Sequence, residues 1–473
     1  MTVIGWLEQH FSRRPPQGDT TVPDDAAGLP DGSTVVIVGG GLAGSAYARQ
    51  LLLLCNKANK RYRVYLINST GCNYCGGLFT DLARMTLHTL YDQGIPADIA
   101  LKEVGSCVYI NSEAGVKVRL HEPMLATLRT SRFGITGFDD SLKERILEGL
   151  NDDIRHCLKI IEPTLVSSLT PPEETPKGRW RVTLSLRRED GEHETLDCDL
   201  LVLATGFRSL NKPMLSEFAR VTGYIPPPVM DASVAEIDTS AAHYNNIGQN
   251  MFILDGIVPN AVVAFIPKGK DWLTMTALGK RLTGDDLETL FSHPAVKKYL
   301  GLDNPREHLR CRTMCPAAVY TGAARNFYGD GWVMLGDLTG YGRVLKDGYF
   351  AAFLGSYLAA RTTIYSGTSK EAWQRQYHRP LRVFEADNRT GMLLYNLNLR
   401  LNQKPWFNRL YMAAAQSEGS GDNPGGPIHA GIRGLASGKI PYALSGVFFA
   451  LGLVRYILRH PLKTLRLIRR QES

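Results

Sequence analysis

Residues 34–44 read Thr34-Val35-Val36-Ile37-Val38-Gly39-Gly40-Gly41-Leu42-Ala43-Gly44. The apolar run over 34–38 is typical of a strand buried in a parallel sheet, and a helix is expected from Ala43 to Cys55. Between them, G-x-G-x-x-G gives a tight turn, a backbone that can approach a pyrophosphate, and close packing of helix on strand. The helix N-terminus adds N–H groups and a positive dipole. The expected phosphate contacts are therefore Gly39, Gly41, Leu42, Ala43 and Gly44.

A second strand is expected over Tyr62 to Ile67, and it ends at Asn68. In a dinucleotide-binding domain this position usually carries an acidic residue that binds a ribose hydroxyl. Asn68 can still accept a hydrogen bond, but it carries no charge. It is therefore a candidate cofactor contact that leaves the choice of dinucleotide open.

Two later segments favour FAD. Residues 199–206 (DLLVLATG) resemble the D-x-x-V-x-A-T-G strand of many flavoproteins, which places Ala204 and Gly206 at the cofactor. Residues 331–337 (GWVMLGD) resemble their late strand, after which Asp337 binds the ribityl chain of the flavin. Three motifs in this order are more specific than any one alone. The sequence holds one dinucleotide fingerprint, so a second site of that kind for a nicotinamide is not expected.

The segment after the late strand is expected to face the flavin ring. A helix is expected from Gly348 to Tyr365, and its N-terminal dipole would stabilise an anionic reduced flavin. Lys346 could add to that stabilisation. The residues assigned to this end of the site are Gly336, Asp337, Gly340, Gly342 and Lys346.

Together the motifs resemble the para-hydroxybenzoate hydroxylase-like FAD superfamily and, within it, the geranylgeranyl reductase family. The resemblance covers residues 34 to 365. The narrower match rests on Tyr74-Cys75-Gly76-Gly77, Phe138-Asp139-x-x-Leu142, Ala264-Phe265-Ile266-Pro267-Lys268 and Gly336-Asp337. It implies hydride transfer from N5 of reduced FAD to one carbon of an isoprenoid double bond, with protonation of the other carbon.

The resemblance also implies a catalytic loop of Cys75, Gly76 and Gly77 beside the isoalloxazine. Cys75 would be a proton donor or thiolate there, although small thiols could equally be filler beside the glycines. The arginine that the family places before F-D-x-x-L is displaced, so Arg132 is assigned to the cofactor with Arg129 as the other candidate. Residues 343–347 (RVLKD) lack the family's proline and G-x-G, so the substrate is not carried over.

The dispersed strands predict an α/β fold: a doubly wound, Rossmann-like FAD-binding domain with a mixed α/β substrate domain inserted, then a helical, membrane-associating tail. The expected divisions are an N-terminal extension and linker over 1–33, the FAD-binding domain over 34–210 and 311–365 with sheet insertions in 100–198, the substrate domain over 211–310, a helical segment and loop over 366–432, and a basic apolar tail over 433–473.

The charge pattern singles out the tail. The 473-residue chain carries a net charge of +8 and is 44% hydrophobic, as expected of a globular protein with a basic excess. Residues 429–470 contain basic but no acidic side chains, and 440–458 are strongly apolar. The uninterrupted apolar part ends at Val454, short of the roughly 20 residues of a spanning helix. A helix lying on an anionic membrane is therefore favoured over one span or a buried helix. Large apolar side chains of this stretch are expected to enter the lipid, among them Phe448, Phe449 and Leu453.

The remaining features limit the partners. The first 14 residues do not resemble a secretory signal, so the cytoplasmic side of a membrane is expected. Nucleic acid is not, because the basic tail adjoins an apolar stretch rather than base-stacking aromatics. No metal site is expected either, because the spacing of Cys311 and Cys315 beside Cys72 and Cys75 is not that of a zinc ribbon.

Three functions stay open. The first is a membrane-associated, FAD-dependent reductase of an isoprenoid or other apolar lipid. The second is an FAD-dependent monooxygenase that hydroxylates an aromatic or quinone-like lipid. The third is a flavin electron carrier without turnover of its own. In each case NAD(P)H or a reduced carrier protein could be the electron donor.

Overall fold

The computed structural model describes residues 28–69, 77–120, 125–131, 136–185, 193–239, 248–269, 272–300, 309–310, 314–344, 348–419 and 425–469. Several assigned residues lie outside these ranges: Cys72, Cys75, Gly76, Arg132 and Lys346.

A six-stranded sheet forms the first domain, in the order β18-β19-β12-β1-β2-β8. All neighbours are parallel except β18 and β19. The strands are β1 (Thr34–Val38), β2 (Arg63–Ile67), β8 (Leu158–Ile161), β12 (Leu200–Leu203), β18 (Tyr328–Gly329) and β19 (Trp332–Met334). Because β2 and β12 pair with opposite edges of β1, the chain changes direction there. Open α/β sheets bind ligands at the carboxyl ends of the strands at such a switch point.

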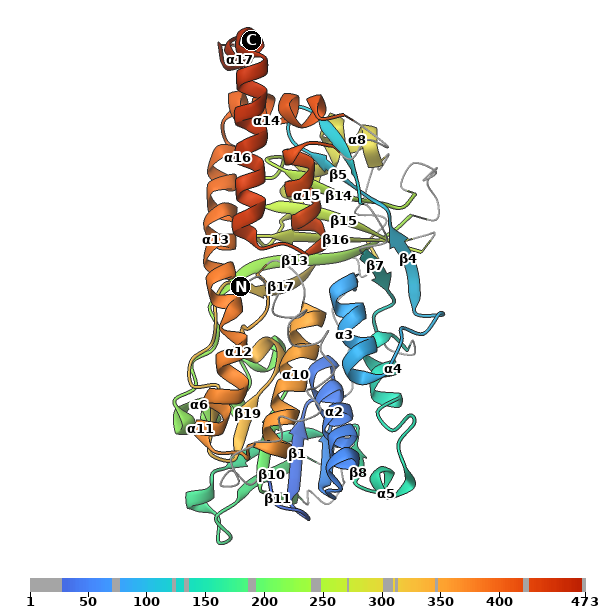
Figure 1. Cartoon of the computed structure of the whole chain (residues 1–473), viewed down its shortest axis with the longest axis vertical. Coiled ribbons are helices and arrows are strands. Elements are labelled where there is room, and N and C mark those ends of the chain that lie inside the picture. Colours follow the sequence, from blue (N-terminus) through green and yellow to red (C-terminus); the bar gives the residue numbers. More distant parts are fainter. Residues whose placement is uncertain are drawn as a thin grey trace, which may run out of the picture.

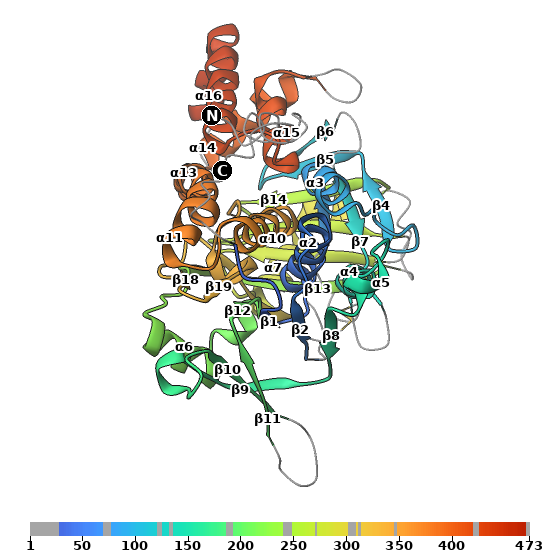
Figure 2. The same ribbon diagram turned by 60° about the horizontal axis from the view of Figure 1, so that its bottom comes forward.

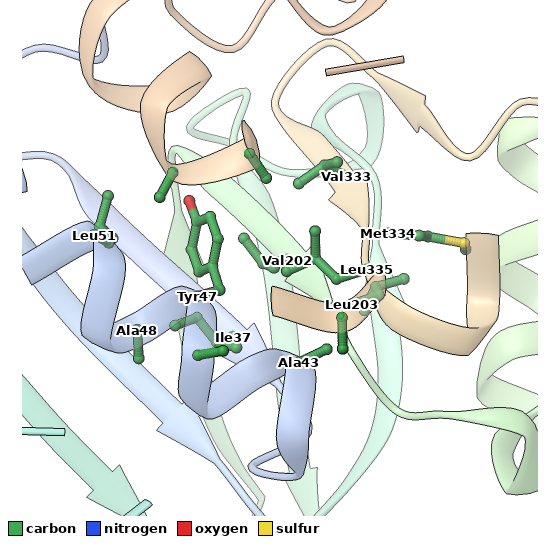
Figure 3. Packing of buried hydrophobic residues seen from close by; sticks show 14 of the residues in the cluster. Ile37, Ala43, Tyr47, Ala48, Leu51, Val202, Leu203, Val333, Met334 and Leu335 are labelled. Atoms are coloured by element: carbon green, nitrogen blue, oxygen red, sulfur yellow. The ribbon is translucent and has the colours of Figure 1, made fainter. Parts of the chain in front are cut away.

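Helices α2 (Leu42–Ala58) and α10 (Gly348–Tyr365) pack against each other on this sheet (Figures 1 and 2). Figure 3 shows Tyr47 of α2 among apolar side chains of the strands. Its hydroxyl hydrogen-bonds with the Thr363 hydroxyl of α10 at 2.9 Å. The predicted strand over 34–38 and the predicted helix over 348–365 are confirmed residue for residue, and the predicted helix over 43–55 lies within α2.

Two smaller sheets accompany the first. One has the order β11-β10-β9, with β9 (Leu165–Thr170), β10 (Trp180–Ser185) and β11 (Glu194–Cys198). The other has the order β3-β7-β4, with β3 (Leu78–Thr80), β4 (Ala100–Val104) and β7 (Leu125–Leu128). The β11-β10-β9 sheet connects β8 to β12, where a doubly wound domain usually has a crossover helix. The flanking helices are α3 (Asp81–Tyr91), α4 (Phe138–Glu144), α5 (Asp152–Arg155) and α6 (Pro213–Thr222).

The second domain is a seven-stranded sheet in the order β17-β13-β16-β15-β14-β5-β6. Its strands are β5 (Ser106–Ile110), β6 (Gly115–Arg119), β13 (Val229–Asp238), β14 (Asn250–Asp255), β15 (Val262–Lys268), β16 (Trp272–Leu278) and β17 (Cys315–Tyr320). Its apolar face packs with α7 (Gly284–Ser292) and α8 (Pro294–Leu300).

This sheet extends past the expected substrate domain over 211–310. Residues 106–119 were expected as insertions in the FAD-binding domain, but 106–110 pair with β14 and 115–119 pair with 106–110, while residues 315–320 pair with β13. The sheet is completed by strands far apart in the chain, which periodicity does not reveal.

From residue 370 on, the described chain is helical, and the longest of its helices run along the second domain (Figure 1). The α-helices of this region are α11 (Lys370–Trp373), α12 (Arg379–Leu381), α13 (Val383–Leu401), α14 (Pro405–Ser417), α15 (Pro427–Ser437), α16 (Tyr442–Arg459) and α17 (Pro461–Arg469), with a π-helical turn over Gln374–His378. Buried residues of α14 and α15 share a core with β5 and β6. The expected tail boundary at 433 therefore falls inside a helix of the globular body.

Candidate functional site

The three fingerprint glycines differ in what surrounds them. A Cβ on Gly39, whose φ is +110°, would lie 2.4 Å from the Ala204 carbonyl oxygen. A Cβ on Gly44 would lie 1.8 Å from the Gly39 carbonyl oxygen. Among the residues that the structure describes, a Cβ on Gly41 would meet nothing within 4 Å. The first two glycines are thus required by packing, whereas Gly41 borders open space in which a ligand can approach the backbone.

The N-terminus of α2 suits an anion. Gly41 is its N-cap, no side chain of a described residue caps it, and its first turn holds no acidic residue. The first N–H groups of a helix lack partners within the helix and favour negative charge. The backbone of Leu42 and Ala43 is therefore placed as the fingerprint predicts.

The end of β2 carries a small polar network. Asn68 Oδ1 accepts a hydrogen bond from the Gly40 N–H at 3.1 Å, so this oxygen braces the fingerprint turn. Asn68 Nδ2 donates to Glu162 Oε2 at 3.0 Å, and Lys143 Nζ donates to the same oxygen at 2.8 Å. Glu162 follows β8, whose pairing with β2 was not evident from the sequence, and it was not among the expected site residues.

The ends of β12 and β19 meet the same turn. The Ala204 N–H donates to the Val38 carbonyl at 2.8 Å, and the Leu335 N–H donates to the Leu203 carbonyl at 2.8 Å. A Cβ on Gly336 would lie 3.0 Å from Ala43 Cβ, at the start of α2. Gly206, with a φ of +66°, has no atom of the described part of the chain within 4 Å of its Cβ position. The residues expected at the cofactor from three separate segments are thus brought together.

Asp337 lies in a short 3₁₀ helix over Gly336–Thr339, directly after β19. Solvent reaches one side of the Asp337 side chain. The protein packed around the rest of it removes water from the carboxyl, and this desolvation raises the pKa of Asp337 to about 6. Burial also raises the pKa of Asp139 to about 6, with smaller contributions from the charges of Asp140 and Asp337. Helix α4, which begins with the F-D-x-x-L motif, therefore lies near the Asp337 carboxyl. A polar ligand bound there would replace the water that reaches Asp337.

The following residues, 340–344, are packed against protein. A Cβ on Gly340 would lie 2.3 Å from the Gly322 carbonyl oxygen, and one on Gly342 would lie 2.1 Å from Tyr320 Oη. Glycine is therefore required at both positions by packing. A direct flavin contact at either one stays a prediction.

Side chains far along the sequence hold this segment, which we call the 340–344 loop. Asn388 Nδ2 donates to the Gly342 carbonyl at 2.7 Å, and its Oδ1 accepts from the Val344 N–H at 2.9 Å. The buried Arg343 guanidinium donates to Asp387 Oδ2 at 2.9 Å and to the Ile440 carbonyl at 2.8 Å. It also donates to the Gly438 carbonyl and lies 4.4 Å from the Tyr442 ring centre. None of these partners was expected from the sequence.

A second cluster of hydrogen-bonded side chains holds Tyr341, which belongs to the 340–344 loop, in place. Tyr341 donates to Glu385 Oε1 at 2.6 Å, so its oxygen accepts from His378 Nε2 at 2.7 Å. His378 Nδ1 is then left to accept from the Tyr328 hydroxyl at 2.8 Å. These groups line a cavity of about 480 Å³. The hydrogen-bond chain fixes the tautomer of the histidine and the position of the loop.

Part of the expected catalytic loop is described. Gly77 has a φ of +107°, and a Cβ there would lie 2.6 Å from the Leu128 carbonyl oxygen, so glycine is required. Arg129, the other candidate for the family's arginine, donates to Asp98 Oδ2 and to the Thr136 carbonyl, each at 2.8 Å. Its guanidinium is thus engaged away from Asp337. The roles of Cys75, Gly76, Arg132 and Lys346 stay predictions.

The motif over 264–268 lies on β15 of the second sheet. Lys268 is buried and pairs with the buried Glu236 at 3.2 Å. Arg310 reaches the other Glu236 oxygen at 3.2 Å and lies 4.5 Å from the Trp272 ring centre. The lysine of this motif is therefore part of a compensated charge cluster inside the second domain.

Several solved structures share this fold at low identity. A geranylgeranyl bacteriochlorophyll reductase-like protein from Thermoplasma acidophilum has a TM-score of 0.59 and 14% identity, over 92% of this chain and 98% of its own. A flavin-dependent halogenase has 0.57 and 16%, over 91% and 78%. A probable FAD-dependent monooxygenase from Pseudomonas aeruginosa has 0.51 and 13%, over 78% and 97%. No protein-family model matches the sequence, and no curated protein matches it.

The likeness shows the fold: an α/β flavoprotein fold with a Rossmann-like domain and a second sheet domain. This confirms the predicted fold class in its main features. Because the three proteins are named for a reductase, a halogenase and a monooxygenase, the fold alone does not decide a reaction.

Proposed function

We propose that this chain, which has the fold of flavin-dependent oxidoreductases, binds FAD and reduces carbon–carbon double bonds of an isoprenoid or other apolar lipid at a membrane surface. One observation carries the cofactor assignment. The open space beside Gly41 lies at the N-terminus of α2. The solvent-accessible Asp337 follows Gly336, whose Cβ position lies 3.0 Å from Ala43 Cβ in the first turn of that helix. These groups suit a pyrophosphate and a ribityl chain respectively.

Different residues of the chain would bind different parts of FAD. The N–H groups at the start of α2 would bind the pyrophosphate, and Asp337 would accept hydrogen bonds from the ribityl hydroxyls. Bound and reduced, FAD would supply the hydride for one carbon of the double bond. By resemblance, Cys75 would supply the proton for the other carbon. The 340–344 loop would keep the flavin end of the site rigid.

The membrane proposal rests on one face of α16 and α17. Large apolar side chains recur there every three or four residues, and all are exposed: Leu444, Val447, Leu451, Val454, Leu458, Leu462, Leu465 and Ile468. The spacing places them along one side of each helix. Basic side chains are exposed on the same two helices: Arg455, Arg459, Lys463, Arg466 and Arg469. We call this set the α16–α17 face, and an anionic lipid surface complements both of its components.

Helix α13 lies against α16 and also carries exposed apolar side chains. A Cβ on Gly446 of α16 would lie 3.1 Å from Leu394 of α13, so the two helices are in contact. On α13, Leu393 and Leu397 are exposed. Phe449 and Leu453, expected to enter lipid, instead pack partly on the core shared by α14 and α15. The lipid-facing residues therefore differ in part from those the apolar run suggested.

Helix α16 is long and apolar enough to cross a membrane by length and composition, with 22% of its 18-residue window buried. Its buried residues, Tyr442, Ser445, Gly452 and Tyr456, face the protein body. A helix with one side against its own protein and one apolar side exposed suits attachment from one leaflet. We therefore propose a monotopic arrangement rather than a span.

The tail cannot be removed at residue 433 without damage. Residues 438–442 supply acceptors for Arg343 and the Tyr442 ring, and Ile432 and Ala436 are buried. A membrane test therefore needs surface substitutions. Val447→Ser, Leu451→Ser and Leu458→Ser together should reduce binding to phosphatidylserine vesicles by about a hundredfold or more, since each buried apolar side chain contributes ~1.5–3 kcal/mol.

The matched control is Leu165→Ser, Val221→Ser and Ile225→Ser, three exposed apolar residues of the first domain. It should bind vesicles like the wild type. High salt should weaken wild-type binding in part, because screening removes the basic contribution. Wild-type protein that stays free of vesicles at low salt contradicts the membrane proposal.

The reaction is tested without oxygen. Chemically reduced holoprotein is mixed anaerobically with polyunsaturated isoprenoid lipids, and the products are analysed by mass. We expect a gain of two hydrogens per reduced double bond. A product that forms only with oxygen, with one oxygen atom added, supports the monooxygenase instead. Flavin oxidation by a partner without any change in lipid supports the electron carrier.

A further inference from the structure

The adenosine end of the proposed FAD site lacks its usual acidic residue. A carboxylate at the end of the second strand normally accepts hydrogen bonds from the ribose hydroxyls. Here Asn68 occupies that position, and its Oδ1 already accepts from the Gly40 N–H. Its Nδ2 donates to Glu162. Both polar atoms of the Asn68 side chain are therefore engaged with protein, and it is poorly suited to bind the ribose.

Strand β8, next to β2, is followed by a carboxylate directly beside Asn68, that of Glu162. Strands β2 and β8 are parallel, with Ile67 opposite Ile161, so Asn68 and Glu162 are the next residues on each. The Asn68 N–H also donates to the Ile161 carbonyl at 3.0 Å. Glu162 thus stands one strand further from β1 than the usual acidic residue, still at the carboxyl edge of the sheet.

Hydrogen bonds to one carboxylate oxygen hold Glu162 in one orientation, and the other oxygen remains available for a ligand. Its Oε2 accepts from Asn68 Nδ2 and from Lys143 Nζ. In the part of the chain that the structure describes, no hydrogen bond reaches Oε1. The Glu162 side chain is 36% exposed, whereas that of Lys143 is 13% exposed. A fixed, accessible carboxylate oxygen at the edge of a dinucleotide site is what a pair of ribose hydroxyls requires.

The network also keeps Glu162 ionised. Desolvation works against the charge, but the hydrogen bonds from Lys143 and Asn68 outweigh it and lower the pKa of Glu162. A carboxylate accepts hydrogen bonds from two hydroxyls and repels a phosphate. The site would therefore favour a dinucleotide with free ribose hydroxyls over one with a 2′-phosphate.

We propose that Glu162, positioned by Asn68 and Lys143, binds the ribose hydroxyls of the adenosine half of FAD in place of an acidic residue at the end of β2. The inference rests on the proposed FAD function. It assigns Asn68 a positioning role, because its side chain joins the fingerprint turn to the ribose-binding carboxylate.

The test compares FAD with its 2′-deoxyadenosine analogue, using fluorescence titration of protein stripped of flavin. Wild type should bind the analogue about ten- to a hundredfold more weakly than FAD, the loss of one charge-assisted hydrogen bond. Glu162→Gln should bind FAD at least tenfold more weakly than wild type and should no longer distinguish the two ligands clearly. Glu144→Gln, which removes an exposed carboxylate from α4, should behave like wild type.

Thermal unfolding of each flavin-free variant shows whether a change in FAD affinity comes from a change in folding. Glu162→Gln keeps the size of the side chain, so little change in stability is expected.

The variant Asn68→Asp provides a second, independent test. It places two carboxylates side by side and should weaken FAD binding, and Asn68→Asp with Glu162→Gln should restore it in part. Unchanged discrimination by Glu162→Gln, or tighter FAD binding by Asn68→Asp alone, overturns the inference while FAD binding stands. Absence of FAD binding by wild type overturns the proposed function as well.

Discussion

The two ends of the proposed FAD site are built in different ways. At the fingerprint turn, Gly39 and Gly44 are required by backbone atoms nearby in the fold, and the pattern of glycines records that requirement. At the 340–344 loop, Arg343 and Val344 are held by side chains and carbonyls 44 to 98 residues away. The first end is specified locally, and the second depends on the C-terminal helices.

This difference couples the C-terminal helices to the cofactor site. Tyr442 opens α16, stacks on Arg343 and donates to the Val344 carbonyl. Its N–H donates to Asp387 Oδ1 at 2.7 Å. The helix that carries the α16–α17 face is therefore fastened to the 340–344 loop at its first residue. Changes to the Arg343 network should therefore lower stability, whereas changes to groups assigned to the cofactor should lower FAD affinity.

The largest effect is expected from Arg343→Ala. It leaves the buried Asp387 carboxylate without its cationic partner and two carbonyls without the arginine donor, which costs about 3–5 kcal/mol of folding free energy. Urea unfolding measures the loss. Arg389→Ala, an exposed arginine of α13, is the matched control and should change stability by less than about 0.5 kcal/mol. Equal unfolding midpoints for the two variants would mean that the C-terminal helices do not hold the loop.

A smaller effect, on affinity, is expected from Asp337→Asn. Loss of a charge-assisted hydrogen bond to the ribityl chain should weaken FAD binding about ten- to a hundredfold at pH 8. Since the Asp337 pKa is raised to about 6, the carboxyl is protonated below that pH. Wild-type affinity should therefore fall as pH drops below about 6, and the variant should lose this dependence.

Titrations at pH 5 and pH 8 check this prediction. Asp139→Asn is the control, because the Asp139 pKa is also raised to about 6 although no ribityl contact is assigned to it. That variant should keep the pH dependence. A flat wild-type profile, or one that disappears only in Asp139→Asn, removes the ribityl role from Asp337.

The smallest change in binding is expected from Cys75→Ala, which should keep FAD but alter turnover or the pattern of lipid products. Cys72→Ala should change them less. The reason is the resemblance that places Cys75 beside the flavin. Wild-type turnover in both variants supports the alternative in which the loop needs only Gly76 and Gly77.

Local patterns predicted the parts of the fold that backbone rules control. The strand over 34–38, the helix after it, and strands β12 and β19 follow from apolar runs and glycine spacing. Side-chain partners across the sheet were not predictable in this way. Glu162 follows a short strand with no recognisable motif, so the residue next to Asn68 could be found only from the β2–β8 register.

The C-terminal region shows the same limit. Composition indicated an apolar, basic tail and placed its start at Arg433. Burial of Ile432 and Ala436 places that start inside the core, and the Arg343 network extends the structural part to Tyr442. Hydropathy reports how apolar a helix is but not which side faces the protein, so Phe449 and Leu453 were assigned to lipid although they pack partly on the core.

The flavin content of Gly41→Val tests the central claim most directly. Beyond its chain neighbours, a Cβ at residue 41 meets no atom of the described residues within 4 Å, so the flavin-free variant should unfold like wild type. It should nevertheless be purified colourless, because the valine occupies the space assigned to the pyrophosphate, while wild type carries one FAD per chain. Gly44→Ala, where a Cβ would lie 1.8 Å from the Gly39 carbonyl oxygen, should instead lose stability. A stable Gly41→Val protein that retains full FAD would contradict the account.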